Sequence, residues 1–271
     1  ILFYFHENQI DYPLSPGEKR DFHMGFTNII SAAAADKVLF NSSYHLESFM
    51  SSARRLMGKL PDYAPVELLE NIRNKAEAAY PGCRFKSGKI FLKTVCEKPP
   101  LILWNHRWEH DKNPEAFYDL LVRLKNENLD FSLAVVGENF STHPPVFEKI
   151  REEFKDRIQA WGFVESRQAY QSWLEKADIV VSCANQENFG ISVVEAIRFG
   201  CLPLLPKRLS YPELIPEEFH QQVVYETHED AAAKLIDMIK GFSGFRMVAE
   251  KLSKNMERFS WDIRVKQYDN I

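Results

Sequence analysis

The chain has 271 residues, of which 45% are hydrophobic and 27% charged, a composition typical of a globular protein with enough length for two domains. Its formal net charge of −4 at pH 7 excludes a global positive field that would attract nucleic acid, although a local basic patch remains compatible with it. The four cysteines show no C-x-x-C spacing, which indicates a reducing, cytoplasmic compartment and argues against a zinc site.

The chain begins directly with a strand of the buried type, Ile1 to Phe5, with no preceding basic region that would mark a signal peptide. No apolar run is long enough to span a membrane. Because a doubly wound domain ordinarily begins with its own βα units, we expect the first part of the N-terminal domain to be missing. His6 follows the strand, and ligands bind outside the carboxyl ends of such strands, so His6 is a candidate site residue. A loop histidine without a function is the alternative.

The next elements complete a partial Rossmann-like domain. The apolar spacing predicts helices at 20–35, from 43 to about 50, and at 65–79, with a strand at 37–40. The segment 80–100 is rich in Pro and Lys and is our candidate interdomain linker. We therefore divide the chain into a partial N-terminal domain with linker at 1–97, a second Rossmann-like domain at 98–255 and a C-terminal helix at 256–271.

Two cations follow the strand Leu101 to Trp104, in a loop that leads to a helix at 115–125. Arg107 and Lys112 could stabilise a departing diphosphate, because its departure builds up negative charge that fixed cations can balance. No D-x-D motif is present, so a metal-bridged diphosphate is not indicated. A surface loop of mixed charge is the alternative.

A strand-loop-helix-strand unit follows at Ile179 to Pro203, after predicted strands at 131–136 and 158–161 and helices at 146–154 and 167–177. Gly190 opens its helix, and a helix N-terminus offers free N–H groups and a positive dipole end to an anion. Glu187 and Glu195 flank this point and can accept hydrogen bonds from hydroxyl groups. The combination suggests a sugar nucleotide as ligand, whereas an ordinary helix with an acidic first turn is the alternative.

The segment from Glu187 to Glu195 resembles the E-x7-E motif of the group-1 family of retaining glycosyltransferases with the GT-B fold. The resemblance implies two doubly wound α/β domains facing a cleft, of which the N-terminal one is incomplete here. It implies that Glu187 contacts the donor sugar and Glu195 the ribose. The spacing of Arg107 and Lys112 is similar to the R-x4-K pattern of the same family. By the same resemblance, the remaining site residues are His6 near the sugar, Phe189, Gly190 and Ile191 against sugar and phosphate, and Phe163 and Val164 near the nucleobase.

Four segments are similar to a narrower group, the tRNA-queuosine α-mannosyltransferases and their bacterial relatives. They lie at residues 4–9, 106–112, 188–195 and 211–213. This resemblance implies GDP-mannose as the co-substrate, with no further cofactor. From the missing D-x-D motif and the lack of a long apolar run, we also expect no metal ion and no membrane association. The resemblance also implies an acceptor, the cyclopentenediol of queuosine in an aspartate tRNA.

Our hypothesis is thus a retaining glycosyltransferase in which the leaving phosphate takes the acceptor proton and no protein nucleophile is needed. Three alternatives stay open at this point. The chain could use another donor or acceptor within the family, it could be an epimerase or phosphorylase on the same fold, or it could be a non-catalytic module that binds a nucleotide or RNA.

Overall fold

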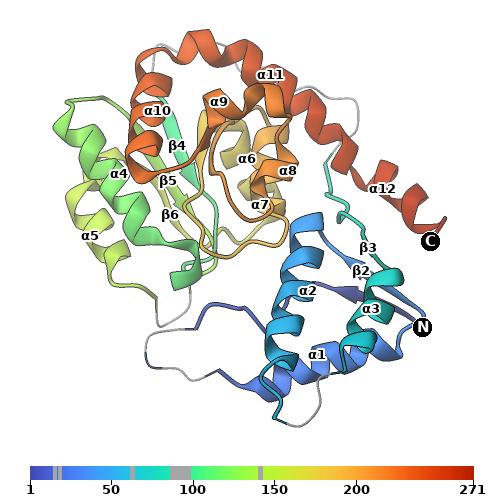
Figure 1. Ribbon diagram of the computed structural model, residues 1–271. Coiled ribbons are helices and arrows are strands. Elements are labelled where there is room, and N and C mark those ends of the chain that lie inside the picture. Colours follow the sequence, from blue (N-terminus) through green and yellow to red (C-terminus); the bar gives the residue numbers. More distant parts are fainter. Residues whose placement is uncertain (15–16, 18–19, 62–64, 86–98, 140–142) are drawn as a thin grey trace.

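The computed structural model describes all residues except 15–16, 18–19, 62–64, 86–98 and 140–142, and it shows an α/β protein with two parallel sheets (Figure 1). A three-stranded sheet lies in the N-terminal part of the chain and a six-stranded sheet in the rest. Each sheet has its own hydrophobic core. The predicted α/β class is confirmed, whereas the predicted boundary at residue 97 lies outside the described residues.

The smaller domain pairs its strands in the order β1, β2, β3. The ring of Phe40 stacks on Phe5 at 5.0 Å and lies 5.2 Å from Phe49 of the following helix, which fixes the end of the first strand beside the second. The elements of this domain are β1 (Leu2–Phe5), α1 (Phe22–Ala34), β2 (Lys37–Phe40), α2 (Ser43–Met57), α3 (Val66–Asn74) and β3 (Ala76–Ala78).

Two predicted helices of this domain have different ends. The helix that begins at Ser43 continues to Met57 rather than to about residue 50, because Phe49 and Leu56 extend its buried stripe. The prediction of a single helix at 65–79 is wrong at its end, since the helix stops at Asn74 and β3 follows. Pairing of β3 with β2 overrides the helix propensity of this alanine-rich stretch.

The larger sheet has the order β6-β5-β4-β7-β8-β9, with all strands parallel. β4, β7 and β8 are buried along their whole length, as expected for parallel strands with helices on both faces. The strands are β4 (Leu101–Trp104), β5 (Ser132–Val136), β6 (Ile158–Gly162), β7 (Ile179–Val181), β8 (Leu202–Pro206) and β9 (Val224–Tyr225).

After the smaller domain, the described part of the chain contains nine α-helices and five short 3-10 turns. β9, α8 and α11 have no counterpart among the elements predicted above from the sequence. The helices are α4 (Pro114–Asn126), α5 (Val146–Glu153), α6 (Arg167–Lys176), α7 (Ile191–Arg198), α8 (Tyr211–Leu214), α9 (His220–Val223), α10 (His228–Lys240), α11 (Arg246–Asn255) and α12 (Trp261–Tyr268), and the turns are η1 (His110–Lys112), η2 (Lys155–Arg157), η3 (Glu217–Phe219), η4 (Phe242–Phe245) and η5 (Met256–Phe259).

The C-terminal segment returns to the smaller domain as η5 and α12, two short helices rather than one (Figure 1). The hydroxyl of Tyr268 donates to the carbonyl oxygens of Ala79 at 3.2 Å and Tyr80 at 3.1 Å. Trp261 packs directly on Gly82, where an added Cβ would lie 1.9 Å from its ring. Within the described residues, no helix has both the length and the apolar character needed to cross a membrane.

Candidate active site

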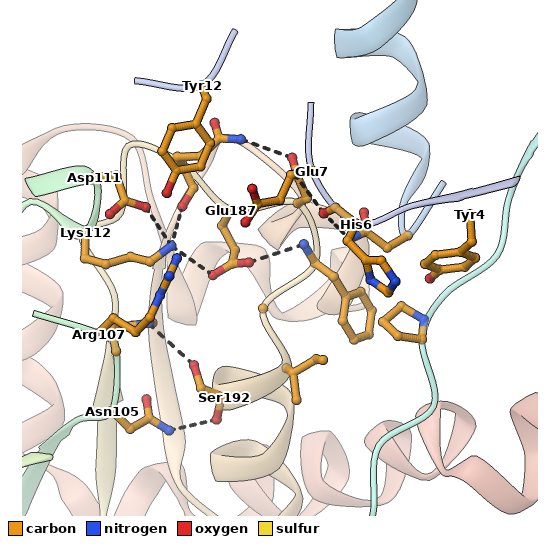
Figure 2. A pocket seen from close by; sticks show the side chains of 18 residues that line it. Tyr4, His6, Glu7, Tyr12, Asn105, Arg107, Asp111, Lys112, Glu187 and Ser192 are labelled. Atoms are coloured by element: carbon orange, nitrogen blue, oxygen red, sulfur yellow. Dashed lines mark hydrogen bonds and ion pairs between the residues drawn. The ribbon is translucent and has the colours of Figure 1, made fainter. Parts of the chain in front are cut away.

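A cavity of about 360 Å³ opens where the carboxyl ends of β1, β4 and β7 meet (Figure 2). β4 and β7 are neighbours in the sheet, although the chain leads from β4 to β5 on the other side. Such a switch point leaves a crevice for a ligand. The lining includes residues 4, 6, 7, 12 and 41 from the smaller domain, residues 105–107, 111 and 112 after β4, and residues 186–192 after β7.

The cavity brings together most of the site residues that the sequence predicted. Three other predicted site residues are not among the described residues that line the cavity, namely Glu195, Phe163 and Val164. Those that line it are His6, Arg107, Lys112, Glu187, Phe189, Gly190 and Ile191.

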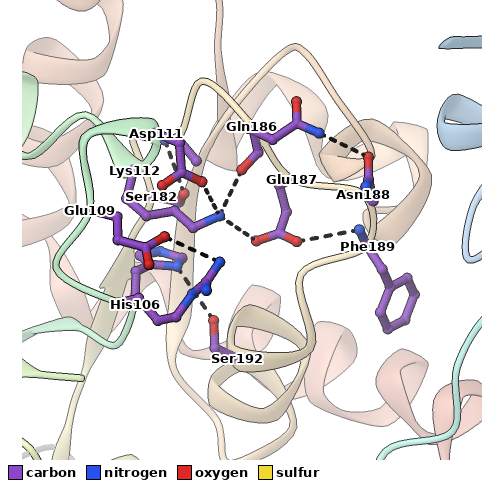
Figure 3. A network of polar contacts seen from close by, with 12 residues as sticks. His106, Glu109, Asp111, Lys112, Ser182, Gln186, Glu187, Asn188, Phe189 and Ser192 are labelled. Carbon is purple, nitrogen blue, oxygen red and sulfur yellow. Dashed lines mark hydrogen bonds and ion pairs between the residues drawn. The ribbon is translucent and has the colours of Figure 1, made fainter. Parts of the chain in front are cut away.

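Lys112 is the buried cation of the site, with 9% of its side chain exposed. Its Nζ donates a hydrogen bond of 2.7 Å to the carbonyl oxygen of Gln186. The carboxylates of Asp111 and Glu187 lie 3.0 Å and 3.5 Å from the same nitrogen (Figure 3). Burial lowers the pKa of Lys112, but the two carboxylates outweigh burial and the net pKa is raised. Lys112 therefore stays charged and ties the loop after β4 to the loop after β7.

Arg107 is the more accessible cation, with 43% of its side chain exposed. Its guanidinium lies 3.2 Å from the carboxylate of Glu109, and Tyr12 of the smaller domain lines the same cavity. Burial lowers the pKa of Arg107, while Glu109 and then Tyr12 raise it, with a raised net value. A charged guanidinium with an exposed edge can bind an anion that enters the cavity.

Glu187 lies in the loop between β7 and α7, opposite Lys112 (Figure 3). One carboxylate oxygen accepts a hydrogen bond of 3.4 Å from the backbone N–H of Phe189, and the other faces Lys112. The main-chain carbonyl of Glu187 accepts from the hydroxyl of Ser210 at 3.2 Å, which anchors the loop. The carboxylate therefore has a fixed position between a cation and a helix start, where it can accept hydrogen bonds from sugar hydroxyls.

Gly190 is the N-cap of α7 and has a φ of 96°, a left-handed conformation that favours glycine. An added Cβ would lie 3.4 Å from the ring of Tyr211 and 3.5 Å from the side chain of Glu187, so the backbone conformation matters more than space. No side chain of a described residue caps this helix, and its first residues line the cavity. Its N–H groups are therefore available to an anionic ligand.

Glu195 lies one turn further along α7 and is 5% exposed. It forms an ion pair with Arg167, the first residue of α6, in which one of the guanidinium nitrogens lies 3.2 Å from a carboxylate oxygen. Burial raises the pKa of Glu195, and Arg167 counteracts part of that rise. Sequence analysis missed Arg167, because the two residues lie 28 positions apart and no local pattern joins them.

Phe163 and Val164 follow the end of β6, as predicted, but lie outside the cavity lining. Phe163 is 60% exposed, whereas Val164 packs against the core of the larger domain. A large exposed ring beside the carboxyl end of a strand could stack on a planar base. Their contact with a nucleobase stays a prediction.

His6 comes from the smaller domain and points its exposed ring toward the cavity (Figure 2). Its carbonyl oxygen accepts from Nδ2 of Asn41 at 3.1 Å and from Nδ2 of Asn188 at 3.4 Å. Its ring lies 4.9 Å from that of Tyr4. Side-chain amides of both domains thus hold the backbone of His6, which places it across the cavity from Glu187.

His106 is a buried lining residue that sequence analysis did not single out. Burial, and then the charge of Lys112, lower the pKa of His106 to about 3, so the imidazole is neutral near pH 7. Its Nδ1 lies 3.5 Å from the hydroxyl of Ser192 in the first turn of α7. His106 could have been identified from its position just after the end of a strand, which is the reason His6 was identified.

The described residues contain no group of three or more His, Cys, Asp or Glu side chains placed to hold a metal ion. Lys112, a buried charge of the cavity, is instead paired with Asp111 and Glu187. This arrangement can bind a ligand that carries both negative charge and hydroxyl groups.

Two family models match the chain. The model for the N-terminal part of tRNA-queuosine alpha-mannosyltransferase matches residues 1–83, and the model for group 1 glycosyl transferases matches residues 89–257. The tRNA-queuosine alpha-mannosyltransferase of Drosophila melanogaster is 34% identical over 280 residues, which covers 100% of this chain and 73% of that protein.

Solved structures share the fold at low sequence identity. TarM has a TM-score of 0.72 at 13% identity, and the match covers 99% of this chain and 49% of TarM. Sucrose-phosphate synthase from Thermosynechococcus elongatus has a TM-score of 0.74 at 14% identity, covering 99% of this chain and 66% of the synthase. The chain therefore spans half to two thirds of the length of these two proteins.

Proposed function

We propose that this chain, which belongs to the group 1 glycosyl transferases, transfers mannose from GDP-mannose to queuosine in tRNA. The acceptor and the sugar are inferred from the similarity to the Drosophila melanogaster protein, which extends over the whole chain. The observation that carries the proposal is the convergence of Arg107, Lys112 and the start of α7 on one cavity at the switch point of the sheet.

The larger domain supports the binding of the nucleotide sugar. Arg107 and the free N–H groups of α7 can hold the diphosphate, with Lys112 behind them. Glu187 would orient the sugar hydroxyls, and Glu195, held by Arg167, would accept from the ribose hydroxyls.

The chemical step that we propose needs charge stabilisation rather than a protein nucleophile. As the bond between sugar and phosphate breaks, negative charge builds up on the diphosphate, and Arg107, Lys112 and the helix amides would stabilise it. The leaving phosphate would take the acceptor proton, so that the anomeric configuration is retained. We propose that no metal ion is required, because the two cations supply the positive charge.

The smaller domain supports the binding of the acceptor. Tyr4, His6, Glu7, Tyr12 and Asn41 belong to its share of the cavity lining, and the carboxylate of Glu7 points into the cavity beside Glu187 (Figure 2). A carboxylate has enough acceptor sites for both hydroxyls of a vicinal diol. Glu7 therefore suits the cyclopentenediol of queuosine.

We place this activity in the cytoplasm, where thiols stay reduced. Cys83, Cys183 and Cys201 are buried. Burial raises the pKa of the Cys83 and Cys183 thiols to about 12, so that both remain protonated and unreactive.

Calorimetry with GDP, UDP and ADP, followed by their sugars, tests the donor. Selective binding of GDP and GDP-mannose is expected, and a preference for UDP or ADP would contradict the proposed donor. A transfer assay then compares an aspartate tRNA that contains queuosine with the same tRNA that contains guanosine at that position. Transfer to the first tRNA alone is expected, and equal transfer to both would contradict the proposed acceptor.

A further inference from the structure

We propose that Glu213 is a positioning residue for sugar transfer, which holds the wall that carries His6 against the wall that carries Glu187. The inference rests on the proposed function, because it concerns the same cavity. Glu213 lies in α8 of the larger domain and is not among the described residues that line the cavity. Its influence on the reaction therefore passes through other residues.

The carboxylate of Glu213 reaches into the smaller domain. One oxygen accepts from the backbone N–H of Tyr44 at 2.6 Å, and the other accepts from the N–H of Ser43 at 3.0 Å and from the hydroxyl of Tyr80 at 2.8 Å. Glu213 is 170 residues away from Ser43 in the sequence. We call these three hydrogen bonds the clasp.

The clasp occupies the start of α2, whose N-terminal end faces α8 (Figure 1). The first N–H groups of a helix have no partner within the helix, and a negative charge is stabilised there by the helix dipole. Within the domain, the hydroxyl oxygen of Ser42 accepts from the N–H of His45 at 3.0 Å. Glu213 thus satisfies two N–H groups that the local cap leaves free.

On the smaller domain, the clasp connects to His6. Asn41 directly precedes Ser42, the N-cap of α2, and its Nδ2 donates to the carbonyl oxygen of His6 at 3.1 Å. Asn41 also lines the cavity, and its Oδ1 lies 2.6 Å from Nδ1 of buried His45. A shift of the start of α2 would therefore move the backbone that carries His6.

On the larger domain, the clasp connects to the wall that carries Glu187. Tyr211 lies two residues before Glu213, and its hydroxyl is 2.6 Å from that of Ser182 in a fully buried position. Its ring packs beside Gly190, at the start of α7. The main-chain carbonyl of Glu213 accepts from Arg258 at 2.8 Å. Since α8 is fixed in this way, the reach of the Glu213 side chain sets the position of the smaller domain's wall relative to Gly190.

Two substitutions test the clasp from its two sides. Glu213→Gln keeps the size of the side chain but presents an NH2 group where an acceptor is needed, so at least one partner loses its hydrogen bond. Ser43→Pro removes one donor on the opposite side. Proline suits the first position of a helix, and Ser42 has φ −161° and ψ 164°, an extended conformation that a following proline requires. Ser43→Ala, which loses only the hydroxyl, is the reference for Ser43→Pro.

The positioning role predicts a specific kinetic pattern. Glu213→Gln should lower kcat for sugar transfer by about tenfold or more, because small misplacement of reacting groups is costly, while the Kd for the nucleoside diphosphate changes less than about twofold. Ser43→Pro should have a lower kcat than Ser43→Ala. The Glu213→Gln/Ser43→Pro double variant should be no slower than Glu213→Gln, because both changes remove the same interaction. Glu218→Gln, at an exposed carboxylate nearby, is the matched control.

Hydrogen exchange at single backbone amides tests the hydrogen bonds of Glu213 without an activity assay. In Glu213→Gln at least one of the amides of Ser43 and Tyr44 should exchange roughly tenfold faster, whereas that of His45, which Ser42 protects, should not. If the wild type is active and Glu213→Gln shows unchanged amide exchange or unchanged kcat, the positioning role of Glu213 is wrong but the proposed function still stands. A parallel loss of nucleotide affinity and kcat would overturn the positioning role as well. A wild type that transfers no sugar to any acceptor would instead overturn the proposed function.

Discussion

The two walls of the cavity hold their polar side chains in different ways. On the wall from the larger domain, Lys112 is buried between Asp111 and Glu187, and Glu195 is paired with Arg167 beneath the surface. On the wall from the smaller domain, the side chain of Glu7 is exposed and forms no ion pair within the described residues. Its hydrogen-bond partner there is the side-chain amide of Gln9 at 3.1 Å.

This difference fits the division of labour that we propose for the two walls. Buried charges with fixed partners reorganise little when a ligand binds, which suits a wall that must stabilise developing charge on a leaving group. Exposed groups with few partners can adapt to an incoming molecule at little desolvation cost, which suits a wall that receives an acceptor. The predictions below test this contrast, beginning with the largest expected effect.

Arg107→Ala should lower kcat by roughly two to three orders of magnitude, because it removes a fixed charge at the leaving group. Initial rates of transfer at saturating donor measure this effect. Arg151→Ala, at an exposed arginine on α5 outside the cavity lining, is the control and should leave the rate unchanged. Near-normal turnover in Arg107→Ala would remove the charge-stabilising role from the donor wall.

Glu195→Gln should raise the KM for the nucleotide sugar by about tenfold, since a neutral amide replaces a charged acceptor and leaves Arg167 without its partner. The effect on kcat should be smaller, because ribose contacts do not change in the chemical step. Glu175→Gln, at an exposed carboxylate on α6, is the comparison. An unaltered KM would exclude Glu195 from the ribose site.

Glu7→Gln should raise the KM for the acceptor by about fivefold and leave the Kd of the donor nucleotide unchanged, because Glu7 belongs to the opposite wall. Queuosine nucleoside, used as a minimal acceptor, separates this effect from contacts with the tRNA backbone. Glu67→Gln, at an exposed residue of α3, is the control. A loss of donor affinity in Glu7→Gln would contradict the assignment of the acceptor to the smaller domain's wall and of the donor to the larger domain's wall.

A buried histidine in each domain makes stability depend on pH. Burial, followed by His6, lowers the pKa of His45 to about 4, and His106 is lowered to about 3. Both pKa values lie below the ordinary 6.5, so the unfolded chain binds more protons as pH falls below about 6.5, and stability declines toward the folded pKa values.

His45→Gln removes one of these two titrations. The slope of the free energy of unfolding against pH should be smaller than in wild type by about 1 kcal/mol per pH unit between about pH 6 and pH 4.5. Urea unfolding at a series of pH values measures the slope. Identical slopes for the variant and the wild type would show that His45 titrates normally in the folded protein.

The sequence alone was sufficient to predict residues of the larger domain that line the same cavity as Arg107. Glu187 and Gly190 belong to one strand-loop-helix unit, and Arg107 and Lys112 to one loop, so their spacing reports local backbone geometry. Parallel strands carry their loops to the same edge, which let two separate patterns be assigned to one site. The predicted strand at 37–40 and those near 101–104 and 179–181 were recovered for the same reason, because short buried strands have a strong apolar signature.

Only the tertiary structure decided which distant residues meet. Arg167 pairs with Glu195, Asn188 reaches the backbone of His6, and Glu213 caps a helix of the other domain. Pairing with β2 also turned Ala76–Ala78 into a strand, against its local preference for helix. The physical reason is common to these cases: a sequence pattern records the conformation of one segment, whereas a hydrogen bond between segments depends on how separate elements pack in three dimensions.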